Sequence, residues 1–312
     1  MAITKTSDLK TIKQSWHEAV STLDREETPF LSSIGTTSTT NILREFFSKK
    51  LNDAAANAQA EGADAPTATS TLATRAANVC QIFAKTRSVS TTVEDSSTVS
   101  NVDHMAEQIK DASKEIKRDI EKAITGPQGS VLSGTRELAG AEAWIKTNAS
   151  HGTDGVTGGY NPTTNVVADV VDGTLREFTE TMLNDAFQDI WEQGGRAKTI
   201  MLGGTLKRKL STFNGGTTVN TAADKKTIVN AVDYYEGDFG KYIVKPNFIM
   251  RTRTVLLLDE TTWAASYLTK FTKKDLPAGG LYEAKMIHAE LTLEARDETG
   301  NGKIADVQAA AV

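Results

Sequence analysis

The residues whose side chains could act in catalysis or bind a metal are few and lie far apart in this sequence. The four histidines are His17, His104, His151 and His288, and none has a cysteine, histidine or carboxylate partner at the spacing of a metal-ligand motif. Cys80 is the single cysteine, so no disulfide can form within the chain. We therefore expect no catalytic residue, metal site or cofactor, which leaves open only a site assembled from distant positions.

The glycine-rich segments match no nucleotide-binding or nucleophile motif. Residues 152–159 lack the G-x-G-x-x-G spacing, and the chain has neither a phosphate-binding P-loop nor a G-x-S-x-G nucleophile elbow. Residues 297–302 carry adjacent rather than alternating acidic residues, unlike a calcium-binding loop. Both segments are predicted to be loops or turns, and an enzyme is the least favoured class of function.

Composition and charge exclude further classes of function. The 312 residues include 35 Lys and Arg against 40 Asp and Glu, a net charge of −5, which is unlike a basic nucleic-acid-binding surface. The longest aliphatic run, 255–258, is far shorter than the ~20 residues that cross a bilayer, and the first eight residues contain no apolar signal segment. We expect a protein of the reducing cytoplasm with no membrane partner.

The elements that must position these side chains include a projecting arm. Residues 1–40 are polar and rich in Thr and Ser, while 41–50 and 78–93 read as strands. The segment between them, 51–77, is nearly devoid of large apolar side chains and is too long for a loop inside a compact domain. We expect the unit 41–93 to project as a ribbon onto a neighbouring molecule; the alternative is a disordered surface insertion.

Helices and short strands make up the rest. Apolar residues at steps of three and four predict an amphipathic helix over 101–125, with a cap among residues 100–103, and a second helix over 166–192. Residues 287–295 alternate apolar and polar side chains, which is typical of a half-buried antiparallel strand. Further strands are predicted at 199–202, 248–250, 255–258 and in a hairpin from 227–232 to 242–244. Because helices and strands do not alternate as βαβ units, the fold class is α+β.

Six short stretches along the chain, taken in their order, carry a resemblance to a known family. They are 27–31 (ETPFL), 61–65 (EGADA), 78–86 (NVCQIFAKT), 136–140 (RELAG), 232–240 (VDYYEGDFG) and 290–296 (ELTLEAR). Together they resemble the major capsid proteins of tailed bacteriophages with the HK97 fold, and look closest to a prophage-like branch described mainly as a domain of unknown function.

The resemblance implies a division of the chain into arm, loop and two domains. These are an N-terminal arm at 1–35, an extended loop at 36–99, a first part of the peripheral domain at 100–164 with its spine helix at 101–125, an axial domain at 165–260, and a second part of the peripheral domain at 261–312.

The resemblance also implies a function. The chain would assemble through pentamers and hexamers into an icosahedral shell that encloses the double-stranded DNA of a tailed phage, built in the cytoplasm of a bacterial host. Its partners would be further copies, portal, scaffolding and decoration proteins, and DNA held without sequence-specific binding. A protein nanocompartment shell of the same fold and a phage tail component are the alternatives. Since the chain begins with a short arm and no Lys–Asn crosslinking pair can be matched, we expect neither maturation cleavage nor crosslinking.

Five basic residues near the predicted ribbon are candidate contacts between subunits: Arg44, Lys49, Lys50, Lys85 and Arg87. We expect them to pair with acidic residues of a neighbour, where such pairs set register more than affinity. The alternative is that they are merely solvated.

Overall fold

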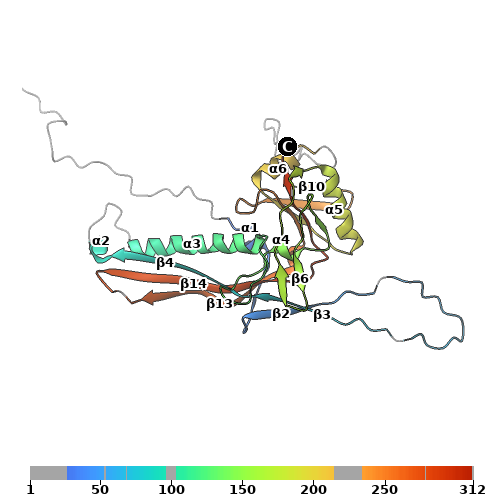
Figure 1. The fold of residues 1–312 in the computed structure, drawn as a ribbon, viewed down its shortest axis with the longest axis horizontal. Coiled ribbons are helices and arrows are strands. Elements are labelled where there is room, and N and C mark those ends of the chain that lie inside the picture. The colour runs from blue at the N-terminus through green and yellow to red at the C-terminus, as the bar shows by residue number, and fades with distance from the viewer. Residues whose placement is uncertain are drawn as a thin grey trace, which may run out of the picture.

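The computed structural model describes residues 27–52, 54–67, 69–95, 103–213, 234–277 and 279–310. Figure 1 shows an elongated molecule with a long limb of helix and strands, a second lobe that carries α5 and α6, and a loop that projects beyond both. Most of the predicted arm 1–35 and the predicted strand 227–232 lie outside the described residues. No helix among the described ranges is long and apolar enough to span a bilayer.

A four-stranded sheet forms the limb. Its order is β1 (Gly35–Ser38), β13 (Trp263–Leu276), β14 (Tyr282–Ala295) and β4 (Gln81–Ser90), with β1 parallel to β13 and the other pairs antiparallel. The alternation predicted for 287–295 is confirmed, because Ile287, Leu291 and Leu293 of β14 lie in the main hydrophobic core. The sheet therefore buries one apolar face over the half of the limb near the body, while the outer half of β13 and the start of β14 are exposed or half-buried.

Helix α3 (His104–Thr125) packs against β4 and β14 and is the helix predicted at 101–125. The Asp103 carboxylate accepts a hydrogen bond from the Ala106 backbone N–H at 2.8 Å and caps the first turn. Its 22 residues span roughly 33 Å at ~1.5 Å per residue. The fully buried stripe of Ile116, Ile120 and Ile124 holds the helix to the sheet. Burial of each such side chain contributes on the order of 2 kcal/mol.

The projecting unit is shorter than predicted. Strand β2 (Leu43–Ser48) pairs antiparallel with β3 (Thr74–Val79), and residues 49–73 form a loop that extends away from the body in Figure 1. The expectation that 78–93 is one limb of this ribbon is wrong, because the chain leaves β3 at Cys80 and β4 then pairs with β14. Buried Phe83 supplies the reason, since it packs into the main core.

The helix predicted over 166–192 forms only in its second half, as α5 (Glu180–Glu192) with Thr179 as its cap. The first half contains β7 (Val166–Ala168), which pairs with β6 (Gly159–Asn161), and β8 (Arg176–Glu177), which pairs with β16 (Val307–Gln308). β-Branched valines favour extended backbone, and here strand partners are within reach.

A six-stranded sheet forms the second lobe, in the order β10 (Tyr234–Gly237), β11 (Gly240–Pro246), β9 (Thr199–Leu202), β12 (Val255–Leu258), β15 (Gly302–Ile304) and β5 (Ala149–Ser150). Strands 199–202 and 255–258 are confirmed, and 242–244 lies in a hairpin whose first strand is β10. The strand predicted at 248–250 is wrong. There the Asn247 side chain accepts a hydrogen bond from the Ile249 N–H and turns the chain.

Short helices complete the fold. They are α1 (Pro29–Ser33), α2 (Thr91–Asp95), α4 (Ala141–Trp144), α6 (Gly204–Leu210) and a 3-10 turn at Glu260–Thr262. Leu206 and Leu210 of α6 share a second hydrophobic core with Leu183 and Phe187 of α5. The six-stranded sheet contributes to both cores, since Met201 and Leu256 lie in the first core while Ile200 and Leu257, on the opposite face, lie in the second.

Candidate functional site

The described residues show no constellation for catalysis or metal binding. No group of three His, Cys, Asp or Glu side chains within them lies close enough to hold a metal ion. Cys80 is buried, and burial raises the pKa of its thiol to about 11, so the thiol stays protonated and unreactive at neutral pH. The features that remain are a projecting loop with a basic root and networks of buried charge that join the parts of the chain.

Arg44 ties the base of the ribbon to the long sheet. Its Nε donates to the Glu294 Oε1 at 2.8 Å, and the Thr37 hydroxyl donates to the same oxygen at 2.9 Å. Burial opposes ionisation of Glu294, but the hydrogen bonds from Arg44 and Thr37 outweigh it and lower the pKa of this carboxyl. The Arg44–Glu294 pair is therefore an internal ion pair with buried acceptor oxygens.

Lys85 and Arg87 lie on β4 and face α3. Arg87 donates from one nitrogen to both carboxylate oxygens of Glu115, at 2.6 and 2.7 Å, and Lys85 lies 2.9 Å from the Asp119 carboxylate. These half-exposed pairs fasten β4 to the helix. Both cations thus have acidic partners in their own chain, and their pairing with acidic residues of another subunit stays a prediction.

Lys49 and Lys50 stand at the root of the loop and are exposed. The Lys50 Nζ donates to the Gln193 Oε1 at 3.0 Å and so ties the loop's root to the end of α5. Within the described ranges, the Lys49 side chain has no hydrogen-bond or ion-pair partner. Of the five predicted contact residues, Lys49 and Lys50 have no acidic partner within the described ranges, and their role between subunits stays a prediction.

The loop itself exposes apolar side chains and ends in a defined turn. Leu51 is 77% exposed and Leu72 is 85% exposed. At the tip, the Ala63 N–H donates to the Ala60 carbonyl at 3.1 Å, and Gly62 has a φ of +79°, which closes a β-turn. Large exposed leucines on a projecting segment are typical of a surface that another molecule covers.

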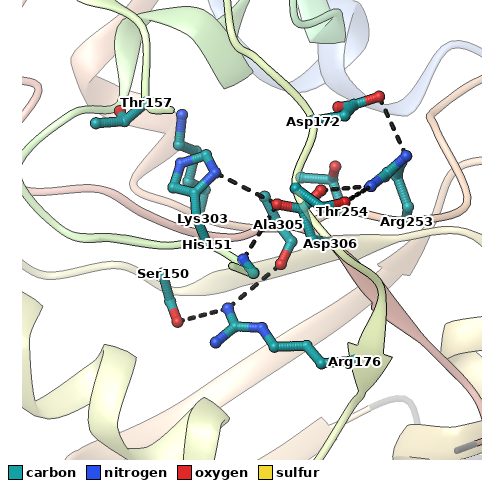
Figure 2. Close-up of polar contacts among 12 residues, drawn as sticks. Ser150, His151, Thr157, Asp172, Arg176, Arg253, Thr254, Lys303, Ala305 and Asp306 are labelled. Atoms are coloured by element: carbon teal, nitrogen blue, oxygen red, sulfur yellow. Dashed lines mark hydrogen bonds and ion pairs between the residues drawn. The ribbon is translucent and has the colours of Figure 1, made fainter. Parts of the chain in front are cut away.

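A network of buried charge lies beside β5, β12 and β15 of the six-stranded sheet and ties the loops around Gly152 and Asp172 to it (Figure 2). Its centre is Asp306, whose carboxylate accepts from the Arg253 guanidinium at 2.6 Å and from the Gly152 N–H at 3.1 Å. Asp306 is 1% exposed and has a φ of +59°, so its backbone is left-handed. Burial would raise the pKa of Asp306, but the hydrogen bonds from Gly152 and Arg253 together lower it.

Lys303 and Glu142 extend the network to α4. The Lys303 Nζ donates to the Glu142 backbone carbonyl at 2.7 Å, and burial lowers the pKa of the amine to about 8. The Glu142 carboxylate accepts from the Thr254 hydroxyl at 3.0 Å and from Arg251 at 3.1 Å, while burial raises its pKa. Segments more than 100 residues apart are joined here, so no sequence spacing could have signalled the network.

His151 lies at the edge of this network. Its Nδ1 is 3.6 Å from the Asp306 carboxylate, longer than a hydrogen bond, and neither ring nitrogen has a hydrogen-bond partner among the described residues. Burial and the nearby Lys303 lower the pKa of His151, so the ring is neutral at neutral pH. This histidine packs beside the network, and no group of three potential metal ligands includes it within the described ranges.

Glu121 of α3 joins three further parts of the chain. Its fully buried carboxylate accepts from the Phe30 and Leu31 N–H groups of α1, both at 2.8 Å, and from the Asn247 amide at 2.6 Å. Burial raises the pKa of Glu121, and these hydrogen bonds oppose the shift. One carboxylate thereby links the start of the described chain, the long helix and the turn after β11.

Solved structures from phages and from a gene-transfer-agent (GTA) capsid have a similar fold. The chain resembles a protein of the cyanophage A-1(L) capsid (TM-score 0.64, 12% identity, 97% of this chain and 98% of that chain), one of Mycobacterium phage Cain (0.61, 14%, 99% and 100%) and the capsid of a native GTA particle (0.63, 11%, 97% and 97%). These likenesses confirm the predicted α+β, HK97-type fold. A comparison with curated protein sequences finds no match.

Structural similarity at 11–14% sequence identity shows the fold alone, whereas a match to a sequence-family model shows membership of the family. The model described as the SU10 major capsid protein matches residues 2–308, which is nearly the whole chain. The match includes the projecting loop, the long helix and the C-terminal strands that close the buried charge network. The chain therefore belongs to the SU10 major capsid protein family.

Proposed function

We propose that this major capsid protein builds its phage shell from pentamers and hexamers of the same chain and that the shell encloses double-stranded DNA. As a member of its family the protein is a structural component of the virion's icosahedral capsid and has no enzymatic role. The observation that carries the proposal is the loop 49–73, which projects from the body with two leucines exposed. Copies in a ring offer each loop an adjacent body to cover.

The parts of the chain have separate roles in this proposal. The four-stranded sheet with α3 forms the peripheral domain, and the six-stranded sheet with α5 and α6 forms the axial domain beside the five-fold and six-fold axes. Strand β15 lies in the six-stranded sheet, which supports placing residues 302–308 with the axial domain instead of the peripheral one. The Lys303–Glu142 and Thr254–Glu142 hydrogen bonds then fix α4 against the six-stranded sheet.

Partners outside the shell follow from the same proposal. A net charge of −5 supports a container that surrounds DNA without gripping the phosphate backbone. Portal, scaffolding and decoration proteins would complete the particle. The single contacts between copies need only modest strength, because each subunit contacts several neighbours and their effects multiply.

Replacement of residues 51–72 by a short Gly-Ser linker tests the role of the loop. The hairpin of β2 and β3 stays intact in this variant, so we expect a folded, soluble subunit that forms no closed shells. Wild-type protein in parallel, followed by size-exclusion chromatography and negative-stain electron microscopy, is expected to form polyhedral particles or rings of five and six. Normal shells from the linker variant would refute the proposed role of the loop.

A further inference from the structure

A hollow of about 500 Å³ lies between the end of α5 and the turn that joins β10 to β11. Its floor is aromatic, because the rings of Phe187 and Tyr242 stack there with their centroids 3.6 Å apart. Its wall is formed by Trp191, which is 61% exposed, and Phe239, which is 39% exposed. Aromatic side chains are enriched where proteins bind one another, so the hollow has the apolar part of a binding surface.

The rim of this hollow is basic. Arg196, Lys198 and Lys241 are among the residues that line it, and no Asp or Glu is. Arg196 and Lys198 are exposed, and neither has an ion-pair partner within the described part of the chain, while Lys241 has a loose, exposed pair with Glu236 at 3.5 Å. The hollow beside α3 differs, because its Lys85 is paired with acidic residues of the helix. The unpaired charges at the end of α5 attract carboxylates.

Tyr242 adds a buried polar group to the floor of the hollow. The residue is 4% exposed, and its hydroxyl has no hydrogen-bond partner among the residues that the structure describes. The hydroxyl of the neighbouring Tyr235, in contrast, is hydrogen-bonded to the Asn184 Oδ1 at 3.0 Å. Burial raises the pKa of Tyr242 to about 12, so its hydroxyl keeps its proton at neutral pH. A buried hydroxyl without a partner is costly, and an acceptor that enters the hollow with a ligand would remove that cost.

The backbone of both walls fixes the shape of the hollow. Gly194 ends α5 with a φ of +79°, and the Gly195 N–H donates to the Ile190 carbonyl at 2.9 Å. On the opposite side, Gly240 in the β10–β11 turn has a φ of +143°. Such left-handed backbone is favoured only for glycine, so both turns are set by the sequence. A ligand therefore meets a formed hollow and has little of the protein to order.

We propose that this hollow binds an acidic segment of a second protein, different from this chain. An apolar side chain of that segment packs on the aromatic floor and wall, its flanking carboxylates face Arg196 and Lys198, and one carboxylate accepts a hydrogen bond from the Tyr242 hydroxyl. Three cations grouped around one hollow favour such a segment over a nucleic-acid strand, whose backbone is followed by an extended basic groove. The inference goes beyond the proposed assembly of rings, because the partner is not another copy.

Peptide binding by the purified full-length chain tests the proposal. The probe is a fluorescein-labelled peptide of sequence EEFEE, with EEAEE and KKFKK as controls of equal length, followed by fluorescence anisotropy. We expect EEFEE to bind at least about tenfold more tightly than either control, a ratio that corresponds to ~1.4 kcal/mol. Equal binding of EEFEE and EEAEE, no measurable binding of EEFEE, or tighter binding of a short oligothymidylate would overturn the proposal.

Three variants locate the binding at the hollow. R196E/K198E reverses the rim and is expected to weaken EEFEE binding at least about tenfold, whereas Y242F removes only the hydroxyl and is expected to weaken it about threefold to tenfold. K110E/K117E makes the same change of charge at two exposed lysines of α3, on the limb of the molecule, and should stay within about twofold of wild type. Equal losses in the two charge-reversal variants would show unspecific attraction to charge and contradict the proposal.

The same titration on assembled particles separates a second protein from another copy of this chain. We expect closed particles to bind EEFEE within about threefold of unassembled subunits, because the hollow stays open to the partner. Binding that disappears on assembly would show that a neighbouring copy covers the hollow, and the choice of partner would be wrong. The titration of unassembled subunits needs no closed shell, so a failure of the proposed ring assembly is distinguishable from a failure of this inference.

Discussion

The attachment of the Gly152 loop and the Arg253 segment to the C-terminal strands should depend on the charge of Asp306, and the substitution Asp306→Asn isolates that charge. Asparagine keeps the volume, one acceptor oxygen and the tolerance for a left-handed backbone at φ +59°. The ion pair with Arg253 becomes a hydrogen bond from the charged guanidinium to a neutral amide oxygen, and the Gly152 N–H faces an amide NH2 in place of its acceptor. Because both the ion pair and the acceptor of a buried N–H are lost, we expect D306N to lose roughly 2–3 kcal/mol of unfolding free energy at pH 7.

The chain offers a matched control. Asp154 also has a positive φ, of 65°, but it is exposed and has no ion pair within the described residues. We expect D154N to stay within about 0.5 kcal/mol of wild type. The assay is urea unfolding of unassembled subunits, followed by tryptophan fluorescence, with D306A as a third variant that adds about 1 kcal/mol of left-handed strain.

The stability difference between wild type and D306N should depend on pH in a direction that follows from the lowered pKa of Asp306. The folded pKa of Asp306 lies below its ordinary value, so the carboxylate stabilises the fold above the unfolded pKa and this contribution disappears as the pH falls through the folded pKa. The gap between wild type and D306N should therefore be full at pH 7 and shrink below about pH 4. A gap under 0.5 kcal/mol at pH 7, or one that does not change with pH, would refute the reasoning.

Two further substitutions probe the other buried charges, by the same unfolding assay. Lys303→Met removes an amine whose pKa is lowered to about 8 in the folded chain. Between pH 8 and 10.5 the unfolded wild-type chain binds more protons at this amine than the folded one, so wild-type stability should rise relative to K303M by about 3 kcal/mol over this range. A stability difference that stays constant over this range would contradict the prediction. Glu121→Ala leaves the Phe30 and Leu31 N–H groups and the Asn247 amide without their buried acceptor, so we expect a loss of ~3–5 kcal/mol, whereas a loss under 1 kcal/mol would show that water replaces the carboxylate.

Helix α3 and strand β14 were predictable from the sequence because their buried side chains recur at the regular spacing of one helix face or one strand face. The stripe of Ile116, Ile120 and Ile124 marks α3, and the alternation of β14 holds over 287–295. Strand β13 escaped prediction, although it pairs along β14, because register shifts between Tyr267 and Thr272 interrupt its alternation. Its outer half is exposed on both faces, so no hydrophobic period marks it.

The wrong sequence predictions elsewhere have a common physical cause. The structure there is set by pairing with residues far away in the chain, and the local sequence pattern carries no information about those partners. The apolar spacing of residues 166–179 fits a helix, yet Val167 pairs with Tyr160 and Arg176 with Val307 as strands. The candidate contact residues show the same limit. Basic residues on a ribbon look available to a neighbour, but the acceptor of Arg44 is Glu294, 250 residues later in the same chain.

These internal pairs change what the loop can do in assembly. Because Arg44 and Lys50 hold both the ribbon's base and the loop's root to the body, the direction in which the loop leaves is set before any neighbour arrives. Binding then has to order only the limbs and tip, and each residue left free costs on the order of 1–2 kcal/mol when it is fixed. A chain that anchors its root in this way can close a ring in one register through contacts that are each weak alone.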